Sequence, residues 1–214
     1  FGSSLLSSRT LAVRQGCKAP GLFGRHLEQM ACSQAPQGAG ESDSCGSQPQ
    51  LEAALAALPS LYALDLRGLF LTQDDVMRVA SALEATPCLR LTSVDLANNQ
   101  LEDASASRLA GVLLAGGVRF LDLSWNKLGQ AGAASLTAAL EAGPGALISL
   151  DLGCNDLGDA GAAVLAPALQ DRQALRALSL GGNRIGPSGG ASLAAALPRC
   201  GLQQLDLERN FLGP

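Results

Sequence analysis

Five aspartates recur along the chain at nearly regular spacing, and they are the residues best placed to do chemistry. Each lies between two apolar residues, as at 121–123, which reads Leu-Asp-Leu. That alternation is typical of a β-strand, on which the aspartate points away from the face that its neighbours bury. Repeated carboxylates can attract basic partners, and pairs of them can act as general acid and base. The five are Asp65, Asp95, Asp122, Asp151 and Asp206.

The other residue types that catalysis needs are missing around these aspartates. The one histidine of the chain is His26, so residues 51–214 cannot assemble a Ser-His or Cys-His nucleophile. They contain no phosphate-binding G-x-x-x-x-G-K-[ST] loop and no C-x-x-C metal pair. Two aspartates of the row would lie on an open surface without a pocket, which argues against glycoside hydrolysis. We therefore expect no catalytic residue, no metal site and no cofactor.

The aspartates belong to a repeated phrase, L-x-x-L-x-L-x-x-N-x-L. It starts at Leu61, Leu91, Val118, Leu147, Leu175 and Leu202, so the steps are 30, 27, 29, 28 and 27 residues. A period of this length is the signature of a leucine-rich repeat array, in which each unit supplies one strand and one helix. Such units bury their leucines only by stacking on one another.

The unit at 118–146 shows how each part is expected to form. Asn126 follows the strand, where its side chain can hydrogen-bond backbone groups of the turn and its backbone tolerates unusual angles. Gly129 and Gly132 are expected to let the chain bend. Leu136 and Leu140 then share one face of a helix, which the Gly-Pro-Gly sequence at 143–145 ends.

The same offsets hold across the array. Apolar residues recur ten and fourteen positions after the Asn slot, and we expect all of them to be buried: Val79 and Leu83, Leu109 and Leu113, Leu136 and Leu140, Leu165 and Leu169, Leu193 and Leu197. The slot itself holds Leu69 in the first unit and asparagine in the rest: Asn99, Asn126, Asn155, Asn183 and Asn210. Because helices are wider than strands, the stack should curve with its parallel strands on the concave face and its helices on the convex face.

Residues 51–214 resemble the ribonuclease-inhibitor-like class of leucine-rich repeats. The pattern L-x-x-L-D-L-x-x-N-x-L-G-D-x-G is intact at 147–161. The class includes ribonuclease inhibitor, the sensor regions of NOD-like receptors and Ran GTPase-activating protein. The resemblance implies an α/β solenoid, a horseshoe of strands and helices that binds proteins.

A partner is expected on the concave face. The aspartates form a row across it, and non-repetitive aromatic and charged residues are expected to give it specificity, because such residues carry most interface hot spots. The candidate partner-binding residues are Tyr62, Asp65, Arg67, Asp95, Phe120, Asp122, Trp125, Asp151, Asp206 and Glu208. Two alternatives stay open. The aspartates could be part of the repeat consensus only, and Phe120 and Trp125 could pack beneath a neighbouring loop.

The first 50 residues differ in composition from the repeats. Residues 1–27 carry Arg9, Arg14, Lys18 and Arg25 and no acid, which fits either an import signal or a basic disordered linker. Residues 33–50 are rich in Gly, Ser, Gln and Pro, and we expect residues 1–50 to form a disordered arm. Residues 51–214 hold about six strand units. The last unit lacks its helix, so we expect the natural protein to continue beyond Pro214.

Composition limits the classes of function. Residues 51–214 carry 11 basic and 16 acidic residues, a net charge of −5, which argues against nonspecific nucleic-acid binding. No run of 18 apolar residues exists, so no membrane-spanning helix is expected. The six cysteines show no metal spacing and are expected to be reduced thiols of an intracellular, cytoplasmic protein, with organelle import by residues 1–27 as the alternative.

The sequence thus predicts a noncatalytic protein-interaction scaffold or sensor. The expected partner is a protein, and the aspartate row would suit one with a basic surface; the oligomeric state is left open. Two alternatives remain. One is a GTPase-activating regulator of the Ran GTPase-activating protein type, and the other is the sensor segment of a larger NOD-like receptor.

Overall fold

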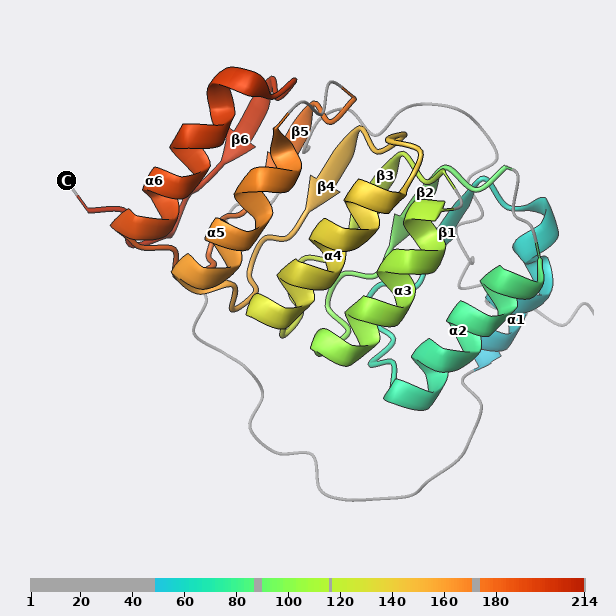
Figure 1. The fold of residues 1–214 in the computed structure, drawn as a ribbon. Helices are drawn as coiled ribbons and strands as arrows, with labels where there is room; N and C mark the ends of the chain where they lie inside the picture. Colours follow the sequence, from blue (N-terminus) through green and yellow to red (C-terminus); the bar gives the residue numbers. More distant parts are fainter. Residues whose placement is uncertain (1–48, 87–89, 116, 171–173, 214) are drawn as a thin grey trace, which may run out of the picture.

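The computed structural model describes residues 49–213, apart from 87–89, 116 and 171–173. In this part of the chain strands and helices alternate (Figure 1). The strands are β1 (Ala63–Asp65), β2 (Ser93–Asp95), β3 (Phe120–Asp122), β4 (Ser149–Asp151), β5 (Ala177–Ser179) and β6 (Gln204–Asp206). The helices are α1 (Pro49–Ala57), α2 (Gln73–Ala85), α3 (Asp103–Ala115), α4 (Gln130–Ala142), α5 (Gly158–Leu169) and α6 (Pro187–Ala196), with short 3-10 turns η1 (Leu58–Ser60) and η2 (Leu197–Arg199).

The six strands form one parallel sheet in sequence order, with the helices in a layer on one side of it (Figure 1). The predicted strand-helix solenoid is therefore confirmed. The first helix begins at Pro49, two residues before the boundary expected at Leu51. The rest of the expected N-terminal arm lies outside the described residues. We call the side of the sheet opposite the helices the open face.

The core lies between the sheet and the helix layer. The middle residue of each strand from β1 to β5 is at most 2% exposed, as the alternation predicts. The apolar positions ten and fourteen residues after the Asn slot are also buried, with one exception. Leu197 is 38% exposed, because α6 ends at Ala196 and Leu197 begins the turn η2 instead of a fourth helical turn. The expectation that Leu197 is buried was wrong.

The asparagine slots hold neighbouring units together. The Asn155 amide group donates to the carbonyl oxygens of Leu152 and Gly153 in its own unit and of Leu123 in the unit before. Its side-chain oxygen accepts from the backbone N–H of Leu128, also in the unit before. Equivalent bonds are made by Asn99, Asn126, Asn183 and Asn210. The predicted amide bonds to the turn are thus present, and they also link one unit to the next.

The unusual backbone angles occur at the residues that flank the Asn slot and not at the slot itself. After the slot, φ is 52° at Phe70, 57° at Gln100 and 57° at Arg184. None of the five asparagines has a positive φ, whereas the residue before each slot does. The φ angles are 65° at Gly68, 57° at Asn98, 56° at Trp125, 53° at Cys154, 69° at Gly182 and 56° at Arg209. The turn requires this left-handed residue so that the following side chain points inward, where its amide can reach backbone groups.

Glycine is present at positions 129 and 132 for a reason other than the bend that we expected. Neither has a positive φ. The backbone N–H of Gly129 donates to Asp103 Oδ1 at 2.7 Å, and a Cβ on Gly132 would lie 2.6 Å from the same oxygen. These glycines therefore let an aspartate on α3 approach the first turn of α4. Asp159 on α5 approaches Gly186 and Gly189 at the start of α6 in the same way.

Candidate protein-binding surface

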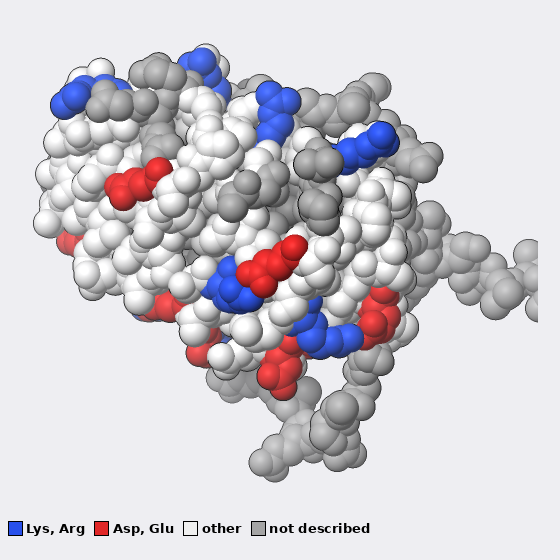
Figure 2. All heavy atoms as spheres, turned by 45° about the vertical axis from the view of Figure 1, so that its right-hand side comes forward, with Lys and Arg blue, Asp and Glu red and all other residues white. Residues whose placement is uncertain are grey.

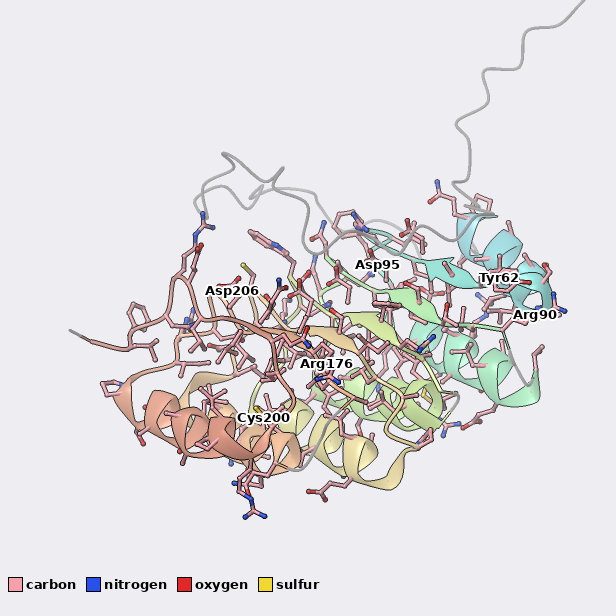
Figure 3. All side chains as sticks on the ribbon, turned by 90° about the horizontal axis from the view of Figure 1, so that it is seen from above. Tyr62, Arg90, Asp95, Arg176, Cys200 and Asp206 are labelled. Atoms are coloured by element: carbon pink, nitrogen blue, oxygen red, sulfur yellow. The ribbon has the colours of Figure 1, made fainter. Side chains whose placement is uncertain are left out.

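Strand register brings the five aspartates into one row on the open face. Asp65 pairs with Asp95, Asp95 with Asp122 and Asp122 with Asp151, while Ser179 stands between Asp151 and Asp206. We call these five carboxylates the aspartate row. Figure 3 shows Asp95 and Asp206 on the side of the sheet opposite the helices. The two ends of the row are exposed, and its centre at Asp95, Asp122 and Asp151 is half-buried.

Each aspartate uses one carboxylate oxygen to hold its own turn. Oδ1 accepts a hydrogen bond from the backbone N–H two residues later, at distances of 3.2, 3.0, 2.9, 2.8 and 2.8 Å from Asp65 to Asp206. This bond gives a structural reason for aspartate at the position. It leaves the second oxygen for another contact. At Asp122 the hydroxyl of Ser124 also donates to Oδ1, so Oδ2 has no hydrogen bond from the described residues.

Arg67 shows how a cation binds this second oxygen. It follows β1, and its Nε and Nη2 atoms both donate to Oδ2 of Asp95 on the next strand. The hydrogen bond to Asp95 is the main reason that the pKa of Arg67 is raised. Among the described residues this is the one ion pair of the aspartate row. Glu208 follows β6 as Arg67 follows β1, so it lies at the other end of the same face, and it is exposed.

Burial disfavours the ionised carboxylates at the centre of the row. Burial raises the pKa of Asp151 to about 6, opposed by the hydrogen bond from Gly153 and increased by the charge of Asp122. Burial also raises the pKa of Asp122, opposed by its bonds from Ser124 and increased by the charge of Asp95. Ser179 occupies the position where a further aspartate would stand and donates to Asp151. A cation at this point would relieve the repulsion between neighbouring carboxylates.

Two aromatic residues of the third unit border the row. Phe120 begins β3 and is half-buried on the open face, two residues before Asp122. Trp125 follows β3 at the carboxyl-terminal edge of the sheet, and it is 44% exposed. Nearly half of the indole surface is thus open to a partner.

Tyr62 lies apart from the two aromatic residues of the third unit. It precedes β1, so it lies at the amino-terminal edge of the sheet, whereas Trp125 lies at the carboxyl-terminal edge. There Arg90 donates to its hydroxyl at 2.9 Å, with the guanidinium carbon 5.7 Å from the ring centre. Figure 3 shows the two side chains together, away from Asp206. The structure thus does not bring Tyr62 together with Trp125, and a role of Tyr62 in partner binding stays a prediction.

On the helix side of the molecule, several charged side chains form ion pairs with one another. Arg78 pairs with Glu52 and Asp75, Arg108 with Glu84 across α2 and α3. Figure 2 shows acidic and basic side chains next to each other on this side. These charges largely neutralise one another, whereas most carboxylates of the aspartate row have no cation beside them in the described part of the chain.

Sequence reasoning assigned no contact to three residues that bond to the candidates. Ser124 and Ser179 donate to the two central aspartates, and Arg90 holds Tyr62. Ser124 could have been found, since it lies two residues after Asp122 on the same face of the strand. The contact of Arg90 with Tyr62 joins residues 28 positions apart and has no local signal.

Four stretches of the chain match the family described as Leucine Rich repeat, at residues 89–110, 118–136, 147–166 and 173–194. Each begins beside one of the strands β2 to β5 and runs into the helix that follows, so the matches coincide with the repeating unit of the fold. The chain is a leucine-rich repeat protein. No match is found among curated proteins.

Solved structures share the fold of this leucine-rich repeat protein. The tropomodulin C-terminal domain of Caenorhabditis elegans is 16% identical, with a TM-score of 0.56, over 70% of this chain and 92% of that one. A structure described as Leiomodin-1 Actin-Binding Site 2 is 20% identical, with a TM-score of 0.57, over 70% of this chain and 86% of that one. At these identities the likeness concerns the fold alone.

Two further findings bear on what the leucine-rich repeats could do. The described residues contain no group of three or more His, Cys, Asp or Glu side chains placed to hold a metal ion. Within the same part of the chain, no helix is both long enough and apolar enough to cross a membrane.

Proposed function

We propose that this leucine-rich repeat protein is a noncatalytic interaction module whose open face binds a basic segment of a partner protein. The observation that carries the proposal is that the two oxygens of each carboxylate have different roles. Oδ1 holds the turn, and Oδ2 is the oxygen to which Arg67 already binds at Asp95. Arginine or lysine side chains of a partner would occupy the equivalent oxygens of the other aspartates.

The neighbours of the row support a protein partner. Gly153 and Gly181 carry no side chain beside the row, so a partner backbone could come close to the sheet. Trp125 and Phe120 offer aromatic area beside Asp122, and aromatic residues are enriched among interface hot spots. Charged contacts of this kind speed association and select a partner of opposite charge.

The test is a selection of peptides from a random display library by the full chain. We expect enrichment of peptides rich in arginine and lysine, with binding that weakens as salt increases. The variant Asp122→Asn/Asp206→Asn should lose this binding. Asparagine keeps an oxygen for the turn but places an amide donor where the partner cation would bind.

The matched control is Asp74→Asn/Glu141→Gln, which removes the same charge from exposed helix positions. It should bind the selected peptides as well as the wild type does. Equal loss in both variants would mean that net charge alone attracts the peptides, and the proposal would fall. Since one structural neighbour is described as an actin-binding site, actin filaments form a separate arm of the same comparison.

A further inference from the structure

The open face has a candidate occupant within the same chain. Residues 1–27 carry Arg9, Arg14, Lys18 and Arg25, with no acidic residue. The open face carries the five aspartates and Glu208 against Arg67, six negative charges and one positive, for a net charge of −5. We propose that the N-terminal segment 1–27 docks on the open face in cis, as a basic pseudo-ligand that an external partner must displace. This inference rests on the proposed function, because it assigns a regulator to the same surface.

The dimensions of the segment and of the row agree. Five gaps between six strands, at about 4.8 Å each, give the row a length of about 24 Å. In an extended chain the nine steps from Arg9 to Lys18 would span about 30 Å, at roughly 3.3 Å per residue. Such a segment is thus long enough to cross the whole row, from Asp65 at one end to Asp206 at the other. Asp95 already holds Arg67, so Asp65, Asp122, Asp151 and Asp206 are the positions left for its cations.

The connection between segment and sheet is long enough. Residues 28–48 separate the segment from Pro49, where α1 begins beside the first unit. Twenty-one residues can reach about 70 Å at most, nearly three times the length of the row. A segment held on such a connection has an effective concentration in the millimolar range. Even weak pairing with the carboxylates would then keep the face occupied.

The cost of charge at the centre of the row favours an occupant there. Burial disfavours the ionised forms of both Asp122 and Asp151, and a neighbouring charge raises each pKa further, Asp95 that of Asp122 and Asp122 that of Asp151. A guanidinium or ammonium group beside them would offset that penalty. On the helix side, Glu52 and Glu84 already have arginine partners.

The chain offers a direct chemical test, because its two lysines are Lys18 and Lys127. A carbodiimide joins a lysine amine to a carboxylate only when the two are in contact. We would treat the full chain at low salt and low concentration, isolate the monomer and map the cross-links by mass spectrometry. The inference requires Lys18 to be joined to Asp65, Asp122, Asp151 or Asp206, and the yield to fall sharply in 0.5 M salt, a concentration at which exposed ion pairs are screened. Cross-links of Lys18 only to helix-side acids or to Glu28, Glu41 and Asp43 would overturn it, as would none at all.

A binding measurement separates this inference from the proposed function. The probe is a synthetic peptide of residues 5–27, added to the full chain and to the variant Arg9→Gln/Arg14→Gln/Lys18→Gln/Arg25→Gln. With the cis segment disabled, the variant should bind the probe about tenfold more tightly than the wild type, if the segment's dissociation constant is about a tenth of its effective concentration. Equal binding by both would refute the cis docking and leave the proposed function standing. No binding of the probe or of any selected basic peptide by either protein would refute both.

Discussion

Replacing Asp151 by asparagine should stabilise the protein at pH 8 and leave it almost unchanged at pH 4. The carboxyl is half-buried at the centre of the aspartate row, and burial raises its pKa from 3.8 to about 6. Between these two values the folded state binds more protons than the unfolded state, so the wild type loses stability as the pH rises through that window. Above about pH 7 the loss is complete. Asparagine, which does not titrate, avoids it.

The magnitude follows from the shift. About two pKa units at 1.36 kcal/mol each correspond to roughly 3 kcal/mol against the ionised form. Because the side chain keeps some contact with water, screening reduces this figure, and we expect a gain of about 2 kcal/mol. Asparagine retains an oxygen to accept from Gly153, so the turn is preserved.

The assay is urea unfolding of the full chain at half-unit steps from pH 4 to pH 8, for the wild type, Asp151→Asn and Asp206→Asn. Asp206 makes the same bond to its turn but is exposed at the edge of the sheet, so its replacement should change the free energy of unfolding by less than about 0.5 kcal/mol at every pH. A difference between Asp151→Asn and the wild type that does not vary with pH would refute the reasoning. So would an equal gain at Asp206.

Three further substitutions test the fold by the same unfolding measurement. Asn155→Ala should cost at least about 2 kcal/mol, because it removes a buried amide that bonds four backbone groups; a loss below 0.5 kcal/mol would contradict this role. Trp125→Gly should be more stable than Trp125→Ala by about 1 kcal/mol, since φ is 56° there; the reverse order would show that the turn relaxes. Gly132→Ala should cost about 1–3 kcal/mol through the clash with Asp103, whereas Gly111→Ala, where a Cβ meets nothing within 4 Å, should gain up to about 1 kcal/mol; similar effects at both glycines would remove the argument from close approach.

The fold and the alignment of the aspartates could be predicted because both depend on period. A leucine such as Leu121 is buried, and Asp122 is opposed to Asp151, once the units stack in register. Those facts need only a constant repeat length. The exposure of Leu197 could not be read in this way, because α6 stops one turn early and the pattern of apolar residues does not record it.

Contacts between units were the part of the site that could not be predicted. Tyr62 was selected by its type and its nearness to a strand, and its hydrogen bond with Arg90 in the next unit was not foreseen. The role of Gly132 likewise depends on an aspartate in the unit before. Contacts between units combine residues about one repeat apart, and no window of adjacent sequence contains both partners.

The asparagine side chains that link units all bond to the unit on their N-terminal side. Each asparagine satisfies backbone groups of the unit before it and none of the unit after it, as Asn155 does for Leu123 and Leu128. Displacing an asparagine therefore leaves backbone groups of the unit before it without partners. The turn that carries Trp125 lies between Leu123 and Leu128, and its backbone N–H also bonds to Gly153 of the fourth unit. A substitution buried in the fourth unit, far from any partner, would thus loosen the aromatic contact presented by the third.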